Sequence, residues 1–133
     1  MIMRSDLPRA VRRLAIAMVL ALPAACGTAD GAAASANRIT GGDAERGRAL
    51  IRAYGCGTCH TVPGVTGANG LVGPPLAGIA SRAYIAGVLP NAPDNMLRWL
   101  QNPRAVDSLT AMPNVGLTAS DARHVAAYLY TLR

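Results

Sequence analysis

Cys56-Gly57-Thr58-Cys59-His60 is the stretch that decides the fold of this 133-residue chain. Two thiols with two residues between them, followed at once by an imidazole, are typical of covalent haem attachment. Each thiol can form a thioether with a haem vinyl group, and the adjacent imidazole then lies under the iron. A thioredoxin-like pair would need a βαβ pattern, and a zinc site a second pair of ligands; the sequence has neither. The motif predicts one haem c per chain, attached through Cys56 and Cys59, with His60 as the proximal ligand.

Helical patterns lie on both sides of this motif. Three segments read as helices: residues 43–54, residues 94–101 or 94–102, and the segment that opens at Thr118. Gly55 ends the first, Pro103 closes the second, and Thr118 has capping-box spacing to Asp121. Residues 61–78 are rich in Gly and Pro, which predicts a loop, and no strand pattern competes. The predicted fold is all-α, with three to five helices around one covalently bound haem.

The first 25 residues differ in composition from the rest. Four arginines precede an uncharged apolar stretch at residues 14–22, which is the layout of a secretory signal peptide. The stretch is far shorter than the roughly 20 residues that a membrane-spanning helix needs. We therefore exclude residues 1–25 from the fold and expect export to the periplasm or the outer face of the cytoplasmic membrane.

Cys26 stands where a bacterial lipoprotein carries its lipid. The preceding Leu22-Pro23-Ala24-Ala25 resembles a lipobox, although Pro23 replaces the usual leucine. This pattern predicts a lipoprotein-type signal and a membrane anchor at Cys26. The alternative is ordinary cleavage after Ala34 or Ala36, which would leave the protein free in the periplasm.

Residues 26–38 read as a flexible tether, because residues 27–37 are almost wholly Gly, Ala, Ser and Thr. Eleven flexible residues reach about 18 Å by random-coil scaling, enough for an anchored domain to reorient. The folded domain is then expected over residues 39–133.

The charge of the chain does not indicate nucleic-acid binding. The formal net charge is +6, but from Cys26 onward nine arginines face six acidic residues, which leaves +3. Every positive charge is Arg, with no Lys, and no basic stripe is interleaved with aromatic residues. The arginines of the signal peptide, and the use of Arg for every positive charge, explain the net charge of the precursor, so we expect no nucleic-acid partner.

A low-spin electron carrier needs a sixth iron ligand, and a methionine thioether favours the ferrous state. Three of the five methionines lie in the leader. Met96 falls on the apolar face of a predicted helix, where packing is its expected role. Met112 lies in a loop before Pro113, so Met112 is the predicted axial ligand. His124 falls off the apolar stripe of the last helix and is expected to be a solvated surface side chain.

In combination, these features resemble a class I cytochrome c over residues 41–133. In that family a glycine on the first helix packs against an aromatic residue on the last, and Gly47 and Tyr128 match these positions. The first helix often carries an aromatic residue one turn after the glycine, whereas this chain has Ile51. The packing there is expected to differ.

The resemblance also implies roles around the haem. Pro74 matches the proline whose carbonyl accepts the proximal imidazole hydrogen bond, and Arg82 and Tyr84 match positions that bind a haem propionate. Trp99 resembles an aromatic residue that lines the methionine side of the haem, which is compatible with a core position. The simpler alternatives are that Pro74 only shapes the loop and that Arg82 is only an exposed surface charge.

The resemblance implies an electron carrier rather than an enzyme. The expected partners are redox proteins: a terminal oxidase, a dehydrogenase or another cytochrome. Residues 84–91 and the Met-Pro-Asn loop resemble cytochrome domains associated with haem-copper oxidases. A dedicated subunit of an oxidase or dehydrogenase complex is therefore an alternative to a free carrier. A haem enzyme or gas sensor with an open iron position is a further alternative, against which Met112 argues.

Overall fold

The computed structural model describes residues 29–133, so the leader and Cys26 lie outside the described residues. Five α-helices, two single-turn 3-10 helices and a two-stranded hairpin follow in the order α2 (Ala29–Thr40), α3 (Ala44–Ala53), η1 (Cys56–Thr58), η2 (Ile79–Ser81), β1 (Tyr84–Ile85), β2 (Leu89–Pro90), α4 (Pro93–Gln101), α5 (Pro103–Val106) and α6 (Ala119–Leu129). The mostly helical fold agrees with the prediction. Within this range no helix is both long enough and apolar enough to cross a bilayer.

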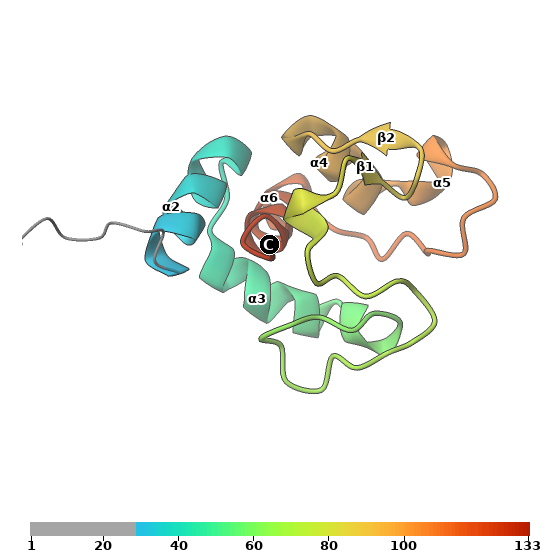
Figure 1. The fold of residues 1–133 in the computed structure, drawn as a ribbon. Coiled ribbons are helices and arrows are strands. Elements are labelled where there is room, and N and C mark those ends of the chain that lie inside the picture. Colours follow the sequence, from blue (N-terminus) through green and yellow to red (C-terminus); the bar gives the residue numbers. More distant parts are fainter. Residues whose placement is uncertain (1–28) are drawn as a thin grey trace, which may run out of the picture.

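Helix α6 is the centre of the fold, and α2, α3 and α4 pack against it (Figure 1). Its first turn is capped by Thr118, whose hydroxyl accepts a hydrogen bond from the Asp121 backbone N–H at 3.0 Å. The sequence predicts one apolar stripe, and all four of its residues are buried: Ala122, Val125, Ala126 and Leu129. Ala127 and Tyr128 are buried as well, because neighbouring helices cover more than one face of α6.

Helices α3 and α6 cross at Gly47. A Cβ atom on Gly47 would overlap the backbone carbonyl of His124 and would lie 3.1 Å from the Cβ atom of Tyr128. The predicted packing of Gly47 against Tyr128 is therefore present, and only glycine allows so close an approach. Ile51, which stands where an aromatic residue is common, is buried in the core one turn later.

Residues 29–38 are helical, so the prediction of a flexible tether is wrong for them. Ala36 is 1% exposed, and the side-chain oxygen of Asn37 accepts a hydrogen bond from the Ala44 N–H at 2.8 Å. Alanine is the best helix former, and its small side chain lets α2 lie close to α6. A segment poor in large apolar residues can thus be ordered, because α6 supplies the apolar surface against which α2 packs.

Two further details differ from the sequence prediction. Pro103 does close α4, but it also begins α5, where the Asn102 side chain accepts from the Ala105 N–H. A short hairpin with two residues in each strand also forms where no strand was expected. It pairs Tyr84 with Pro90 and Ile85 with Leu89. Its turn places Ala86 and Gly87 at positive φ, a local conformation that alternation of apolar residues cannot reveal.

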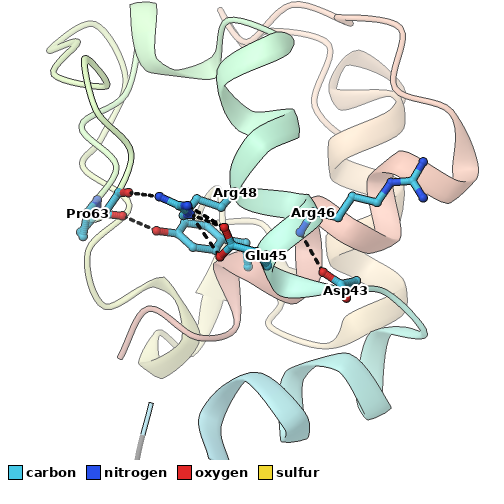
Figure 2. Close-up of polar contacts among 7 residues, drawn as sticks. Asp43, Glu45, Arg46, Arg48 and Pro63 are labelled. Carbon is cyan, nitrogen blue, oxygen red and sulfur yellow. Dashed lines mark hydrogen bonds and ion pairs between the residues drawn. The ribbon is translucent and has the colours of Figure 1, made fainter. Parts of the chain in front are cut away.

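The loop after the Cys-x-x-Cys-His motif is tied to the helices at Pro63 and Gly64. The Tyr128 hydroxyl donates to the Pro63 carbonyl at 2.7 Å, and Arg48 donates to the Gly64 carbonyl at 3.4 Å. Figure 2 shows Arg48 between this loop and Glu45, with which it forms an ion pair at 2.6 Å. These contacts fix where the loop leaves the motif.

Candidate functional site

The two cysteines lie on a single 3-10 turn directly after α3. Gly55, at φ +70°, ends the helix, and the N–H of His60 donates to the Cys56 carbonyl at 3.0 Å. Both thiols are free and half-buried, and burial raises the pKa of the Cys56 thiol. A disulfide does not join them, so both sulfurs are chemically open to thioether formation.

Gly57, between the two cysteines, is packed against the following loop. Its missing side chain leaves room for Ala68, since a Cβ atom there would lie 2.7 Å from the Ala68 Cα atom. The Gly57 carbonyl accepts a hydrogen bond from the Gly70 N–H at 3.0 Å. The loop over residues 61–70 therefore supports the motif on one side.

His60 is held by a second loop, which contains Gly73 and Pro74. Its Nδ1 atom lies 2.7 Å from the Pro74 carbonyl oxygen, which is the hydrogen bond that the family resemblance implied. Because a carbonyl can only accept, Nδ1 carries a proton, and in the neutral imidazole the lone pair is therefore on Nε2. Nε2 is therefore the atom that can bind a metal, with its orientation set by the bond at Nδ1.

Gly73 lies against the face of the same imidazole. A Cβ atom on Gly73 would be 2.7 Å from Nδ1 and 2.9 Å from Nε2 of His60, and its N–H donates to the Cys59 carbonyl at 2.8 Å. Any larger residue would displace the ring. The sequence analysis noted the Gly-Pro segment but did not predict this steric role of Gly73.

Met112 and Met96 occupy the two different environments that the sequence predicts. Met112 is half-buried in the irregular segment between α5 and α6 and packs at the edge of the core, while Met96 is 2% exposed inside it. The Met112 N–H donates to the Thr110 hydroxyl at 3.2 Å, which fixes the turn. Iron ligation by Met112 stays a prediction, and Met96 has the packing role expected of it.

His124 is not the solvated side chain that the sequence predicts. It is half-buried, and its Nδ1 atom accepts a hydrogen bond from the Asp43 N–H at 2.9 Å. Asp43 is the N-cap of α3, so His124 joins α6 to the start of that helix. The close crossing at Gly47 brings the two groups together, which periodicity alone cannot show.

Of the two residues expected near haem propionates, Arg82 contacts the loop that follows Pro74. The Nη2 atom of Arg82 donates to the carbonyls of Pro75 at 2.5 Å and Ala77 at 3.0 Å. Tyr84 is 57% exposed on β1, and Trp99 is buried on α4. A propionate role for Arg82 and Tyr84 stays a prediction, whereas the core position of Trp99 is observed.

Sequence reasoning missed Asn91 and Tyr130. The Asn91 amide nitrogen donates to the carbonyls of Ile79 and Arg82, both at 2.8 Å, and its side-chain oxygen accepts from the Tyr130 hydroxyl at 2.9 Å. The sequence contains no motif that pairs these residues, which stand 39 positions apart.

The residues present fit a covalently bound haem. Two free thiols, an imidazole with its Nδ1 atom bound to a carbonyl, and the Met112 thioether at the edge of the core are the kinds of donor that such a group requires. Large apolar side chains are also exposed on the loops next to Pro74 and Met112: Leu71 (89%), Val72 (80%) and Leu109 (92%). Such side chains suit contact with a flat, largely apolar ring. Along the right side of Figure 1, these two loops run after α3 and after α5.

Comparison with known proteins agrees with this site. Residues 44–133 match the family described as cytochrome c, and the chain belongs to the cytochrome c family. Membership implies a covalently bound haem c and haem-based electron transfer, the role of a carrier rather than of an enzyme. Helix α2 precedes the matched range.

One curated relative is named cytochrome c oxidase subunit 2, from Alkalihalophilus pseudofirmus. It is 30% identical over 91 residues, which are 68% of this chain and 26% of that protein. The match thus spans about a quarter of the relative's length. No solved structure matches the chain.

Proposed function

We propose that this chain is a monohaem c-type cytochrome that carries single electrons between respiratory-chain partners outside the cytoplasm. The observation that carries the proposal is the 2.7 Å contact between His60 Nδ1 and the Pro74 carbonyl. It occupies Nδ1, so Nε2 is the ring nitrogen that could bind the iron of a haem attached through Cys56 and Cys59. Histidines that bind a metal almost always donate their other ring N–H to a partner of this kind.

The haem supplies the redox chemistry, and the chain supplies attachment, ligands and orientation. Cys56 and Cys59 would hold the group at the end of α3, and His60 and Met112 would supply one ligand each from different loops. With His60 and Met112 both bound to it, the iron would keep no position for a substrate, which would suit electron transfer better than catalysis. Methionine sulfur stabilises the ferrous state and so raises the midpoint potential.

The leader and Cys26 support export followed by lipid anchoring. The alternative cleavage sites, after Ala34 and Ala36, lie inside α2, and Ala36 is buried there. Cleavage after Ala34 would remove half, and cleavage after Ala36 two thirds, of a 12-residue helix that packs on α6. Processing at Cys26 keeps α2 whole, and the short segment before α2 then holds the domain close to the membrane. Labelling with a fatty-acid probe, lost in Cys26→Ser, tests the anchor.

A respiratory oxidase is the partner best supported. The relative named cytochrome c oxidase subunit 2 is similar to this chain over about a quarter of its own length. The same likeness supports the second candidate, a dedicated subunit of such a complex. Purification in mild detergent separates the two, because a free carrier emerges alone and a subunit brings its complex with it.

The test of the proposed function is a potentiometric titration of the exported, haem-loaded protein. We expect one covalent haem per chain, a reversible one-electron transition and slow or absent binding of carbon monoxide to the reduced form. A chain without covalent haem, or one that binds carbon monoxide at once, contradicts the proposal. Because the net charge after the leader is only +3, electron transfer to a partner should depend only modestly on ionic strength.

A further inference from the structure

The loop that orients His60 depends on side-chain donors for its shape. Pro74 and Pro75 have no backbone N–H, so the loop cannot donate a backbone hydrogen bond at either of these two successive positions. Its carbonyl groups are held instead. Pro74 accepts from His60, while Pro75 and Ala77 accept from the guanidinium of Arg82.

The backbone of Arg82 is itself held by Asn91. The Asn91 side-chain nitrogen donates to the carbonyl of Ile79, which begins η2, and to the carbonyl of Arg82, which follows it. The Asn91 backbone N–H donates to the Ala83 carbonyl at 2.9 Å. Both side-chain donors of Asn91 are therefore used, and they fix the backbone from which the Arg82 side chain extends.

Tyr130, at the end of α6, orients the Asn91 amide. Its hydroxyl donates to the Asn91 side-chain oxygen at 2.9 Å, and burial raises the pKa of Tyr130 to about 12, so the hydroxyl keeps its proton. Without this donor the amide oxygen loses its partner in a half-buried site, and the amide is free to turn. The two donations to residues 79 and 82 would then weaken together.

We propose that Asn91 and Tyr130 are positioning residues for His60, acting through Arg82 and the carbonyl of Pro74. The proposal rests on the proposed function, since it assigns to His60 the role of iron ligand. The four residues of this relay are Tyr130 at the C-cap of α6, Asn91 before α4, Arg82 after η2, and Pro74. None of these four would touch the iron, and they would act on it only through His60.

The relay predicts an electronic effect as well as a structural one. A firm hydrogen bond from Nδ1 makes the imidazole a stronger donor and favours ferric iron. Weakening this hydrogen bond should lower the ratio of oxidised to reduced protein at a fixed potential by about threefold. A change of this size is expected from one modest hydrogen bond.

The test uses the haem-loaded protein with Tyr130→Phe and Asn91→Asp, and with Tyr54→Phe as the matched control. Tyr54 also donates from its hydroxyl, but to Asp121, at 2.8 Å, on the first turn of α6. Hydrogen exchange of the His60 Nδ1–H is followed by NMR in the reduced state, beside the backbone amides of α3. We expect several-fold faster exchange at His60 in the first two variants, with α3 amides unchanged, and no such difference in Tyr54→Phe.

Two results overturn the relay. One is unaltered His60 exchange and potential in both relay variants; the other is an increase that merely follows a general rise in exchange across α3. Either of these is read in protein that carries haem, so the proposed function stands. Absence of covalent haem from the unsubstituted chain contradicts the proposed function itself, and the relay with it.

Discussion

The Nδ1 atom of His60 lies 2.7 Å from the Pro74 carbonyl oxygen, and the neighbouring Gly73 lies against the same ring. The hydrogen bond sets the direction of the imidazole, and the missing side chain of Gly73 provides the space for it. These two adjacent residues thus act on His60 in different ways. One binds the ring at its edge, and the other allows the backbone to approach its face.

Gly73→Ala should displace the His60 ring. The added methyl group would lie within 3 Å of both ring nitrogens, so the ring or the loop must shift. We expect a smaller yield of haem-loaded protein and an altered midpoint potential in what remains, measured by absorbance and potentiometric titration. Gly87→Ala is the control, because its Cβ would meet nothing within 4 Å although its φ is +76°. It should cost about 1 kcal/mol of stability and leave the potential unchanged. An unchanged potential and yield in Gly73→Ala would contradict the steric role.

Gly47→Ala should destabilise the protein, although alanine is the better helix former. Propensity alone predicts a gain of about 1 kcal/mol inside a helix. The Cβ atom would instead overlap the His124 carbonyl, so α3 and α6 must separate, at a cost of about 2–3 kcal/mol. Denaturant unfolding gives the sign directly, and a stabilised variant would show that the helices do not cross here as described.

Ala36 and Ala34 form a matched pair for testing whether α2 is part of the fold. Ala36 is buried against the domain and Ala34 is exposed on the same helix. Ala36→Asp should lower the free energy of unfolding by about 2–4 kcal/mol, because it places a charge in an apolar contact. Ala34→Asp should change it by less than about 0.5 kcal/mol. Equal, small effects at both positions would show that α2 does not stabilise the domain and would favour a flexible tether instead.

Asp121 should make part of the stability depend on pH. Hydrogen bonds from Tyr54 and then Thr118 lower the pKa of Asp121 below its ordinary value of 3.8. In acid the unfolded chain therefore takes up a proton before the folded one does. The contribution of Asp121 is fully present above the unfolded pKa and is lost as the pH falls through the folded pKa. Asp121→Asn should flatten the decline in stability below about pH 4, measured by denaturant unfolding at several pH values; an unchanged acid limb would count against these bonds.

Helix positions were predictable from sequence where a local signal marks an end. Thr118 caps α6, Gly55 ends α3 and Pro93 begins α4, and each acts within a turn of its own position. Helix α2 lacks such signals, and its order comes from contact with α6, which a composition of small residues does not show. The hairpin at residues 84–90 has only two residues in each strand, too few for a repeating pattern.

The candidate site divides in the same way. Cys56, Cys59 and His60 are adjacent in sequence, so their chemistry could be read from spacing, and the family resemblance supplied the contact with Pro74. The steric role of Gly73, the bonds of Arg82 to two carbonyls and the link between Asn91 and Tyr130 depend on how distant segments meet. His124 shows the same limit, since its partner Asp43 stands 81 residues away.

The axial role of Met112 is the central claim, and the spectrum of the ferric protein tests it most directly. Met112→Ala should abolish the far-red charge-transfer band of methionine-ligated haem and allow rapid carbon monoxide binding once the protein is reduced. Met96→Ala is the matched control: it should cost about 2–5 kcal/mol of stability, as expected for a buried side chain, and keep the band. A band that survives in Met112→Ala, or that is absent from the unsubstituted haem-loaded protein, would contradict the account.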